Sequence, residues 1–235
     1  MENVKKKYTE FHLKKNSQHL YPTEWVIRTM LGSYPELKLD KSNYQGGKIL
    51  DLGFGDGRNM KLLSNCGLNI HGVEITQETV DLCYKSLEIL KVQAELKVGS
   101  NTNIPYENDY FDYILASSSC YYLDEDNTFD DNMREINRVL KKGGSFIANL
   151  PAFIDNDKIP QNFILENAEH LEDGHVIIRN DIYGLRNGYK FKTFDSKQGV
   201  LDYFSKDFQN ISIGLSMDNY YGVQINSIFI TCRKK

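Results

Sequence analysis

The sequence has few cysteines and lacks any long apolar segment. Its four cysteines, Cys66, Cys83, Cys120 and Cys232, are scattered over 235 residues without the short spacings of a zinc site. We therefore expect reduced cysteines, no metal and a cytoplasmic location. No apolar run approaches the roughly 20 residues that a membrane-spanning helix needs. The charged N-terminus also does not resemble a signal peptide, so we expect no membrane association.

Positive charge is not in excess either. The chain carries 28 Lys and Arg against 32 Asp and Glu, a formal net charge of -4 at pH 7. Its short basic clusters, at 5–7 and 14–15, fall in a polar stretch up to about residue 17 that we expect to be a solvated tail. Nucleic-acid binding surfaces need a basic stripe. We therefore expect no nucleic-acid partner.

What the sequence does contain is a glycine turn between a buried strand and a helix. The apolar run Ile49–Leu52 indicates the strand, Gly53, Gly55 and Gly57 follow it, and apolar residues at helical spacing resume at Met60. Glycines let the backbone turn and let a ligand approach it closely. The N–H groups at a helix start favour an anionic group. This stretch therefore predicts a site for a nucleotide-like ligand.

The next predicted strand, 69–74, ends in Glu74. A carboxylate at this position can accept hydrogen bonds from both hydroxyls of a ribose. A dinucleotide-binding loop would also need a small residue at position 58, which is Arg58 in this chain. An NAD-dependent dehydrogenase therefore remains only a less favoured alternative.

The pattern D-x-G-x-G-x-G over 51–57, followed by Glu74, resembles the class I S-adenosylmethionine-dependent methyltransferases. Further segments match that family in the correct order, namely 99–101, 104–112 and 134–144. The resemblance extends from about residue 44 to the C-terminus. Ser100 is a departure, because the family usually carries an Asp there to hold the adenine.

The resemblance implies a Rossmann-like α/β fold, a doubly wound, mostly parallel sheet of seven strands with an antiparallel final strand. We expect a tail and lid helix over 1–43 and a methyltransferase domain over 44–235, with an insertion at 151–194 near the active site. Apolar periodicity predicts helices at 21–31, with Pro22 in the first turn, at 76–91, at 126–140, where Gly143 stops the helix, and after an Asp195 cap. It predicts strands at 49–52, 69–74, 95–98, 112–117, 146–150, 211–215 and 225–232. A hairpin is predicted in which 176–178 pairs with 189–194.

The resemblance also implies S-adenosylmethionine as cofactor, S-adenosylhomocysteine as product and a set of cofactor-binding residues. These are Asp51, Gly53, Phe54, Gly55, Gly57, Arg58, Asn59, Glu74, Ile75, Ser100, Asn101 and Ser117. Asp51 could accept hydrogen bonds from N–H groups of the turn or pair with the ammonium group of the donor. Arg58 and Asn59 could hold the donor's carboxylate or simply be solvated at the helix start.

Candidate substrate-binding residues are Tyr21, Arg28, Tyr121 and Tyr122. For Arg28, an ordinary surface ion pair is an equally good interpretation. The segment 117–120 reads Ser-Ser-Ser-Cys and lacks the Asn/Asp-Pro-Pro-aromatic motif of amino-methylating DNA enzymes. No histidine is marked as a general base, and no catalytic residue is assigned. We therefore expect O- or N-methylation of a small molecule, a sugar or sugar nucleotide; a cofactor-binding module without catalysis is the alternative.

Overall fold

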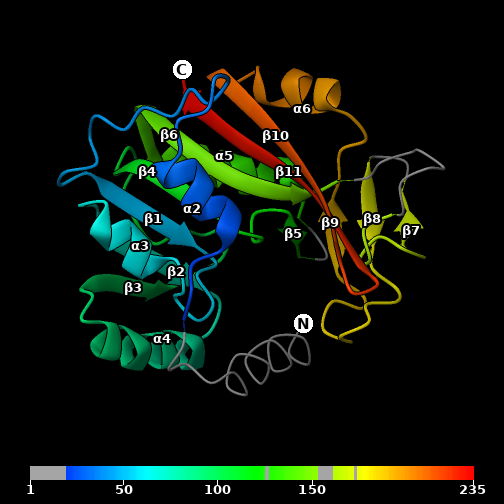
Figure 1. Cartoon of the computed structure of the whole chain (residues 1–235), viewed down its shortest axis with the longest axis horizontal. Helices are drawn as coiled ribbons and strands as arrows, with labels where there is room; N and C mark the ends of the chain where they lie inside the picture. Colours follow the sequence, from blue (N-terminus) through cyan, green and yellow to red (C-terminus); the bar gives the residue numbers. More distant parts are fainter. Residues whose placement is uncertain (1–19, 125–126, 153–160, 172–173) are drawn as a thin grey trace.

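The computed structural model describes residues 20–124, 127–152, 161–171 and 174–235. Within these ranges the chain forms a seven-stranded sheet with helices on both faces and a smaller sheet near the carboxyl ends of its parallel strands (Figure 1). The predicted N-terminal tail, 1–17, lies outside the described residues, as do parts of the predicted insertion. The division of the chain at 43 and 44 stays a prediction.

The large sheet has the strand order β10-β11-β6-β4-β1-β2-β3. Its strands are β1 (Lys48–Leu52), β2 (Asn69–Glu74), β3 (Ala94–Val98), β4 (Phe111–Ala116), β6 (Leu140–Pro151), β10 (Phe208–Tyr220) and β11 (Val223–Lys234). β1 pairs in parallel with β2 and with β4, and β4 pairs in parallel with β6. β11 runs antiparallel to both β6 and β10. This confirms the predicted seven-stranded, mostly parallel sheet with an antiparallel final strand.

The helices are α2 (Glu24–Leu31), α3 (Met60–Asn65), α4 (Gln77–Leu90), α5 (Phe129–Val139) and α6 (Lys197–Phe204). α2 begins later than predicted, because Thr23 is its N-cap and Pro22 precedes that cap. Thr76, where the predicted helix starts, is the N-cap of α4, since its side chain accepts a 3.3 Å hydrogen bond from the N–H of Thr79.

Two predicted helix boundaries are wrong. α5 ends at Val139 because Leu140 is already extended, and Gly143, with φ of +76°, lies inside β6 instead of stopping the helix. The N-cap of α6 is Ser196, not Asp195. The Ser196 hydroxyl accepts a 3.0 Å hydrogen bond from the N–H of Gly199.

Two apolar cores lie on opposite faces of the large sheet. On one face α2, α3 and α4 contribute Trp25, Met60 and Cys83 to a core with the inner strands. On the other face α5 and α6 contribute buried aromatic residues such as Phe129 and Phe204. The helices thus cover both faces and leave the carboxyl ends of the parallel strands open, which is where open α/β sheets bind ligands.

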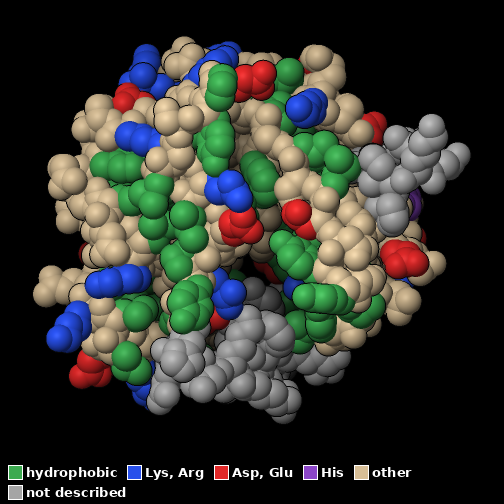
Figure 2. All heavy atoms as spheres, in the orientation of Figure 1, with side chains coloured by type: hydrophobic (Ala, Val, Ile, Leu, Met, Phe, Trp, Pro, Cys, Tyr) green, Lys and Arg blue, Asp and Glu red, His purple; other side chains and the backbone are tan. Residues whose placement is uncertain are grey.

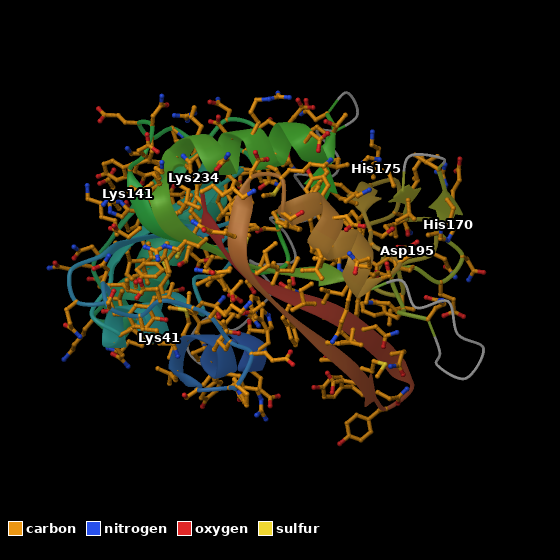
Figure 3. All side chains as sticks on the ribbon, turned by 90° about the horizontal axis from the view of Figure 1, so that it is seen from above. Lys41, Lys141, His170, His175, Asp195 and Lys234 are labelled. Carbon is orange, nitrogen blue, oxygen red and sulfur yellow. The ribbon has the colours of Figure 1, made fainter. Side chains whose placement is uncertain are left out.

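The second sheet contains four short strands in the order β5-β9-β8-β7. They are β5 (Tyr122–Leu123), β7 (Glu169–His170), β8 (His175–Ile177) and β9 (Lys190–Lys192). β8 pairs antiparallel with β9, and β9 pairs with β5, so that Tyr122 lies opposite Phe191. This sheet joins the inserted segment to the chain that follows β4. His170, His175 and Asp195 lie at this side of the molecule, away from the large sheet (Figure 3).

None of the helices in the described ranges is long and apolar enough to cross a membrane.

Candidate functional site

A cavity opens at the carboxyl ends of β1, β2 and β4. The space, part of it open to solvent, amounts to about 930 Å³, which is within the range of small-molecule sites. Among its lining residues are the predicted Gly53, Glu74, Ile75, Ser100, Asn101 and Tyr122, together with Ser118, Ser119, Asp124, Asn132 and Tyr189, which the sequence did not predict. The structure therefore brings together residues from the glycine turn, the next strand end and the inserted segment.

Gly53 and Gly57 are required for different reasons. Gly53 lines the cavity at φ of +68°, and an added Cβ would come 2.5 Å from the Cβ of Ser119. Gly57, at φ of +75°, faces the core instead, where an added Cβ would come 2.5 Å from Sγ of Cys83. The absence of a side chain at Gly53 therefore lets the turn approach Ser119 at the cavity wall, whereas its absence at Gly57 lets α4 pack against the turn.

Glu74 is held by backbone N–H groups on both sides. Its Oε1 accepts a 3.0 Å hydrogen bond from the N–H of Gly55, and its Oε2 accepts a 2.7 Å bond from the N–H of Ile75. The residue is buried and lines the cavity. Burial raises the pKa of its carboxyl, and the two amide hydrogen bonds oppose that shift. The carboxylate is thus fixed before any ligand arrives.

Asp51 is buried with 1% of its surface exposed. Within the described residues, neither of its carboxylate oxygens has a hydrogen-bond partner. Burial, and then the charges of Glu74 and Asp56, raise the pKa of Asp51 to about 8. No N–H of the turn bonds to this carboxyl, so Asp51 is not the acceptor for the turn that the sequence allowed, and Asp51 is not among the residues that line the cavity.

The other predicted residues of the turn have partners within the protein. Nε of Arg58 donates a 2.8 Å hydrogen bond to Oδ1 of Asp56. Oδ1 of Asn59 accepts a 3.0 Å bond from the N–H of Thr23, which precedes α2. Phe54 is buried in the core and does not line the cavity. These three residues support the turn, and Asn59 joins it to the N-terminal segment.

The segment after β3 contributes both predicted residues to the cavity wall. Oγ of Ser100 lies 3.2 Å from the hydroxyl of Thr102, with which it shares a hydrogen bond. Nδ2 of Asn101 donates a 2.9 Å hydrogen bond to the carbonyl oxygen of Ser119. Asn101 therefore connects the ends of β3 and β4 across the cavity.

After β4, the cavity is lined by Ser118 and Ser119, while the predicted Ser117 is not among the lining residues. Ser118 has a φ of +59°, which is uncommon for a residue other than glycine. Its N–H donates a 2.7 Å hydrogen bond to Oδ1 of Asn149, in β6. That bond holds the turn in this conformation.

Tyr121 and Tyr122 lie stacked, with ring centroids 5.0 Å apart, and Tyr122 lines the cavity. Nε of Arg186, in the inserted segment, donates a 3.1 Å hydrogen bond to the hydroxyl of Tyr122. Arg186 in turn is held by the buried Asp181, whose Oδ2 lies 3.1 Å from Nη1 of Arg186. Arg186 and Asp181 were missed by sequence reasoning, because a contact 64 residues apart leaves no local pattern.

Three of the four predicted substrate residues do not line this cavity, namely the buried Tyr121, and Tyr21 and Arg28. Tyr21 is 75% exposed. Arg28 forms a 2.7 Å ion pair with Glu24 on the surface of α2 and lines a different groove, between α2 and β10. The Trp25 ring stacks on the ring of Phe229 in β11, with centroids 5.3 Å apart, and so anchors α2 on the sheet. Among the described side chains, no group of His, Cys, Asp and Glu is placed to hold a metal ion.

Comparisons with known proteins identify a methyltransferase domain in this chain. A family profile described as "Methyltransferase domain" matches residues 50–148. The chain is 30% identical over 129 residues to the sterol 4-C-methyltransferase strm-1 of Caenorhabditis elegans, covering 54% of this chain and 36% of that protein. It is 25% identical over 154 residues to an uncharacterized protein of Methanocaldococcus jannaschii, covering 66% and 57%. The chain thus spans between about a third and three fifths of these curated relatives.

Solved structures resemble the whole described fold. A possible histamine N-methyltransferase from Thermotoga maritima matches with a TM-score of 0.62 at 15% identity, covering 100% of both chains. A SAM-dependent methyltransferase from Methanosarcina mazei matches with a TM-score of 0.61 at 17% identity, covering 86% of this chain and 98% of the other. At such identities the likeness shows the fold alone. The sequence match therefore identifies a methyltransferase domain over residues 50–148, and the fold is one that S-adenosylmethionine-dependent methyltransferases of known structure share.

Proposed function

We propose that the protein transfers a methyl group from S-adenosylmethionine to a small-molecule acceptor. The observation that carries this proposal is the pair of buried carboxyls, Asp51 and Glu74, at the carboxyl ends of adjacent strands beside a glycine turn. S-adenosylmethionine is the family's cofactor, and its ammonium and sulfonium groups are cationic. Glu74 lines the cavity, and Asp51 is buried close enough to interact with it. Such a pair fits a cationic ligand, because each carboxyl would lose part of its desolvation cost when a cation lies nearby.

The residues of the site suggest a division of contacts with that cofactor. Glu74 would hold the ribose hydroxyls, and Asp51 would lie near the ammonium group. Ser100 and Asn101 would meet the adenine from the end of β3. When bound, the cofactor supplies an electrophilic methyl carbon. The chain's own contribution is to fix the reactants and exclude water, and such positioning can supply about 7–11 kcal/mol.

We assign the acceptor to the part of the cavity walled by the inserted segment. Tyr122, Tyr189 and Asp124 line it there. Burial raises the pKa of the Tyr122 phenol, with Arg186 opposing the shift, so the phenol is protonated near neutral pH. It is therefore a group that orients the acceptor by a hydrogen bond and is not a general base. Phenols and a carboxylate suit the hydroxyls of a sugar or sugar nucleotide, with O- or N-methylation as the reaction.

The surface supports a small acceptor over a nucleic acid. The chain is acidic, with a net charge of -4. Figure 2 shows the Lys and Arg side chains of the α2 face scattered between acidic and apolar groups, without a continuous band. Nucleic-acid binding depends mainly on such bands of positive charge. We place the reaction in the cytoplasm, because the four scattered cysteines are expected to be reduced.

We also propose that α2 and the segment before it act as a lid on the cofactor. The hydrogen bond from the N–H of Thr23 to Asn59 supports this, because it joins the start of α2 to the helix that follows the glycine turn. α2 itself is anchored on β11 through Trp25.

A screen with methyl-labelled S-adenosylmethionine tests the proposed function. Candidate acceptors are sugars, sugar nucleotides, small amines and phenols, with duplex DNA and a structured RNA as comparison. We expect label transfer to a small molecule and none to nucleic acid. Tight donor binding without turnover on any class would instead favour the cofactor-binding module without catalysis, and transfer to RNA or DNA would refute the small-molecule assignment.

A further inference from the structure

The outer edge of β10 is open. β10 is the terminal strand of the large sheet and pairs with β11 on its inner side. Within the described residues, no backbone–backbone hydrogen bond joins β10 to a segment other than β11, although the Ser212 hydroxyl accepts a 2.9 Å bond from the N–H of Lys38 and donates a 2.6 Å bond to the carbonyl oxygen of Glu36. In Figure 1 β10 forms the upper margin of the sheet, and Figure 3, seen from above, shows the strand running between α6 and α2 with no other strand beside its outer edge. A strand of 13 residues therefore presents unpaired N–H and C=O groups.

Apart from a bulge near its start, this edge lacks the features by which proteins prevent strand addition. Exposed edges are normally blocked by Lys, Pro, inward charges or short length. Residues 208–220 contain neither Lys, Arg nor Pro, and Asp218 is their one charged residue. Leu215 and Met217 are 42% and 48% exposed. An edge that is long, apolar and nearly uncharged is a site at which another strand can pair.

The sequence of the edge is complementary to itself in an antiparallel register. If Leu215 lies opposite its own copy, Ile213 lies opposite Met217 and Ser212 lies opposite Asp218. Because side chains alternate across a strand, every odd-numbered residue from 213 to 217 then falls on one apolar face, and the polar residues fall on the other. The two Asp218 carboxylates lie at opposite ends, so like charges do not meet.

A bulge limits how far this pairing can extend. The register between β10 and β11 shifts between Gln209 and Ser212, and Asn210 has a φ of +50°. Regular strand geometry in β10 therefore begins at Ser212. The segment 212–218, which is the part that is self-complementary, lies wholly on the regular side of the bulge.

We propose that β10 pairs with β10 of a second copy of this chain, so that two seven-stranded sheets join edge to edge across a twofold axis at Leu215. The partner is a second copy because the register matches apolar residues with apolar residues and keeps the two Asp218 carboxylates apart. The interface combines main-chain hydrogen bonds with six apolar side chains, three from each copy. This proposal does not depend on the methyltransferase reaction.

Size-exclusion chromatography with light scattering measures the predicted assembly. We expect wild-type protein at tens of micromolar to have twice the 27.1 kDa mass of one chain. Leu215→Lys and Leu215→Glu should each be monomeric, because like charges would face each other at the axis. An equimolar mixture of the two variants should restore the dimer mass, since Lys then faces Glu. A monomeric wild-type protein, or failure of the mixture to dimerise, would overturn the proposal.

Two controls separate this interface from other effects. Tyr221→Lys adds the same charge at the fully exposed turn after β10, outside the paired segment, and should leave the dimer intact. Circular dichroism should show the fold unchanged in all the variants.

In addition, the four native cysteines are buried, so Leu215→Cys provides an accessible thiol at the axis. Mild oxidation should link it into a covalent dimer, and Tyr221→Cys should not link; linkage through Tyr221→Cys alone would place the interface elsewhere.

Discussion

The N–H of Gly55 donates a 3.0 Å hydrogen bond to Oε1 of Glu74. The acid that ends β2 is therefore also a structural partner of the glycine turn that follows β1. One carboxylate fixes the turn and faces the cavity, so the site is ordered by contacts within the protein. This arrangement avoids part of the entropic cost of ordering a loop when ligand binds.

Replacement of Glu74 tests this dual role. Glu74→Gln keeps a carbonyl oxygen for one amide hydrogen bond but removes the charge and the second acceptor oxygen. We expect the affinity for S-adenosylhomocysteine to fall about tenfold, because charge-assisted hydrogen bonds contribute about 1.5–3 kcal/mol each. Calorimetric titration measures this. Glu78→Gln, on the exposed start of α4, is the matched control, and equal affinity of both variants would remove Glu74 from the cofactor site.

Asp51 predicts a pH dependence of stability. Its pKa of about 8 in the folded protein lies above its ordinary value of 3.8, so the folded state holds the proton more tightly than the unfolded state. Its contribution to stability is complete below pH 4 and is lost as the pH rises toward 8. The slope should be up to about 1.4 kcal/mol per pH unit. Glu74, whose pKa is also raised, adds a change of the same sign that is common to wild type and variant.

Urea unfolding at pH 5, 6, 7 and 8 checks this prediction. The stability of Asp51→Asn relative to wild type should increase as the pH rises. Glu107→Gln, an exposed replacement of the same kind, should run parallel to wild type. Parallel curves for Asp51→Asn would show that this carboxyl is ionised in the folded protein.

Gly57 predicts a stability effect that is separate from binding. Gly57→Ala should destabilise the fold by about 1–3 kcal/mol, through its positive φ and the contact with Cys83. Gly46→Ala has a similar φ of +81° but nothing within 4 Å of the added Cβ, so it should cost less. Adding Cys83→Ala to Gly57→Ala should recover part of the loss. Simple additivity in the double-mutant cycle would show that the two residues do not compete for space.

Replacement of Arg186 should change turnover of the acceptor without changing affinity for the donor. Arg186→Gln removes the hydrogen bond to the Tyr122 hydroxyl and the ion pair with Asp181. We expect the affinity for S-adenosylhomocysteine to stay within about twofold, while turnover of the acceptor found in the screen falls at least tenfold. Tyr122→Phe should behave in the same way. Loss of donor affinity in either variant would place the inserted segment over the cofactor.

Local sequence signals predicted the parts of this fold that depend on neighbouring residues. The glycine turn, the position of Glu74 and the large sheet follow from apolar runs and glycines close together in the chain. The small sheet could not be predicted in this way, because β5 and β7 contain two residues each, too few to show an alternation of apolar and polar residues. The predicted hairpin captured only the pairing of β8 with β9.

The chemistry of the site depended on contacts that no pattern records. Nothing near Asp51 in the sequence shows that its carboxyl is buried without a hydrogen-bond partner among the described residues. Arg28 was a candidate for the site from its residue type, yet its contacts are with Glu24 on the surface of α2. Burial and long-range pairing decided both cases, and both are properties of the folded chain.

Isothermal titration calorimetry with S-adenosylmethionine, S-adenosylhomocysteine and NAD tests the central claim most directly, because it needs no knowledge of the acceptor. We expect one site per chain for the first two ligands, with affinity lost in Gly53→Val, which fills the cavity wall beside Ser119. NAD should give no binding heat. Binding of NAD, or no heat with either S-adenosyl compound, would contradict the assignment of this cavity to the methyl donor.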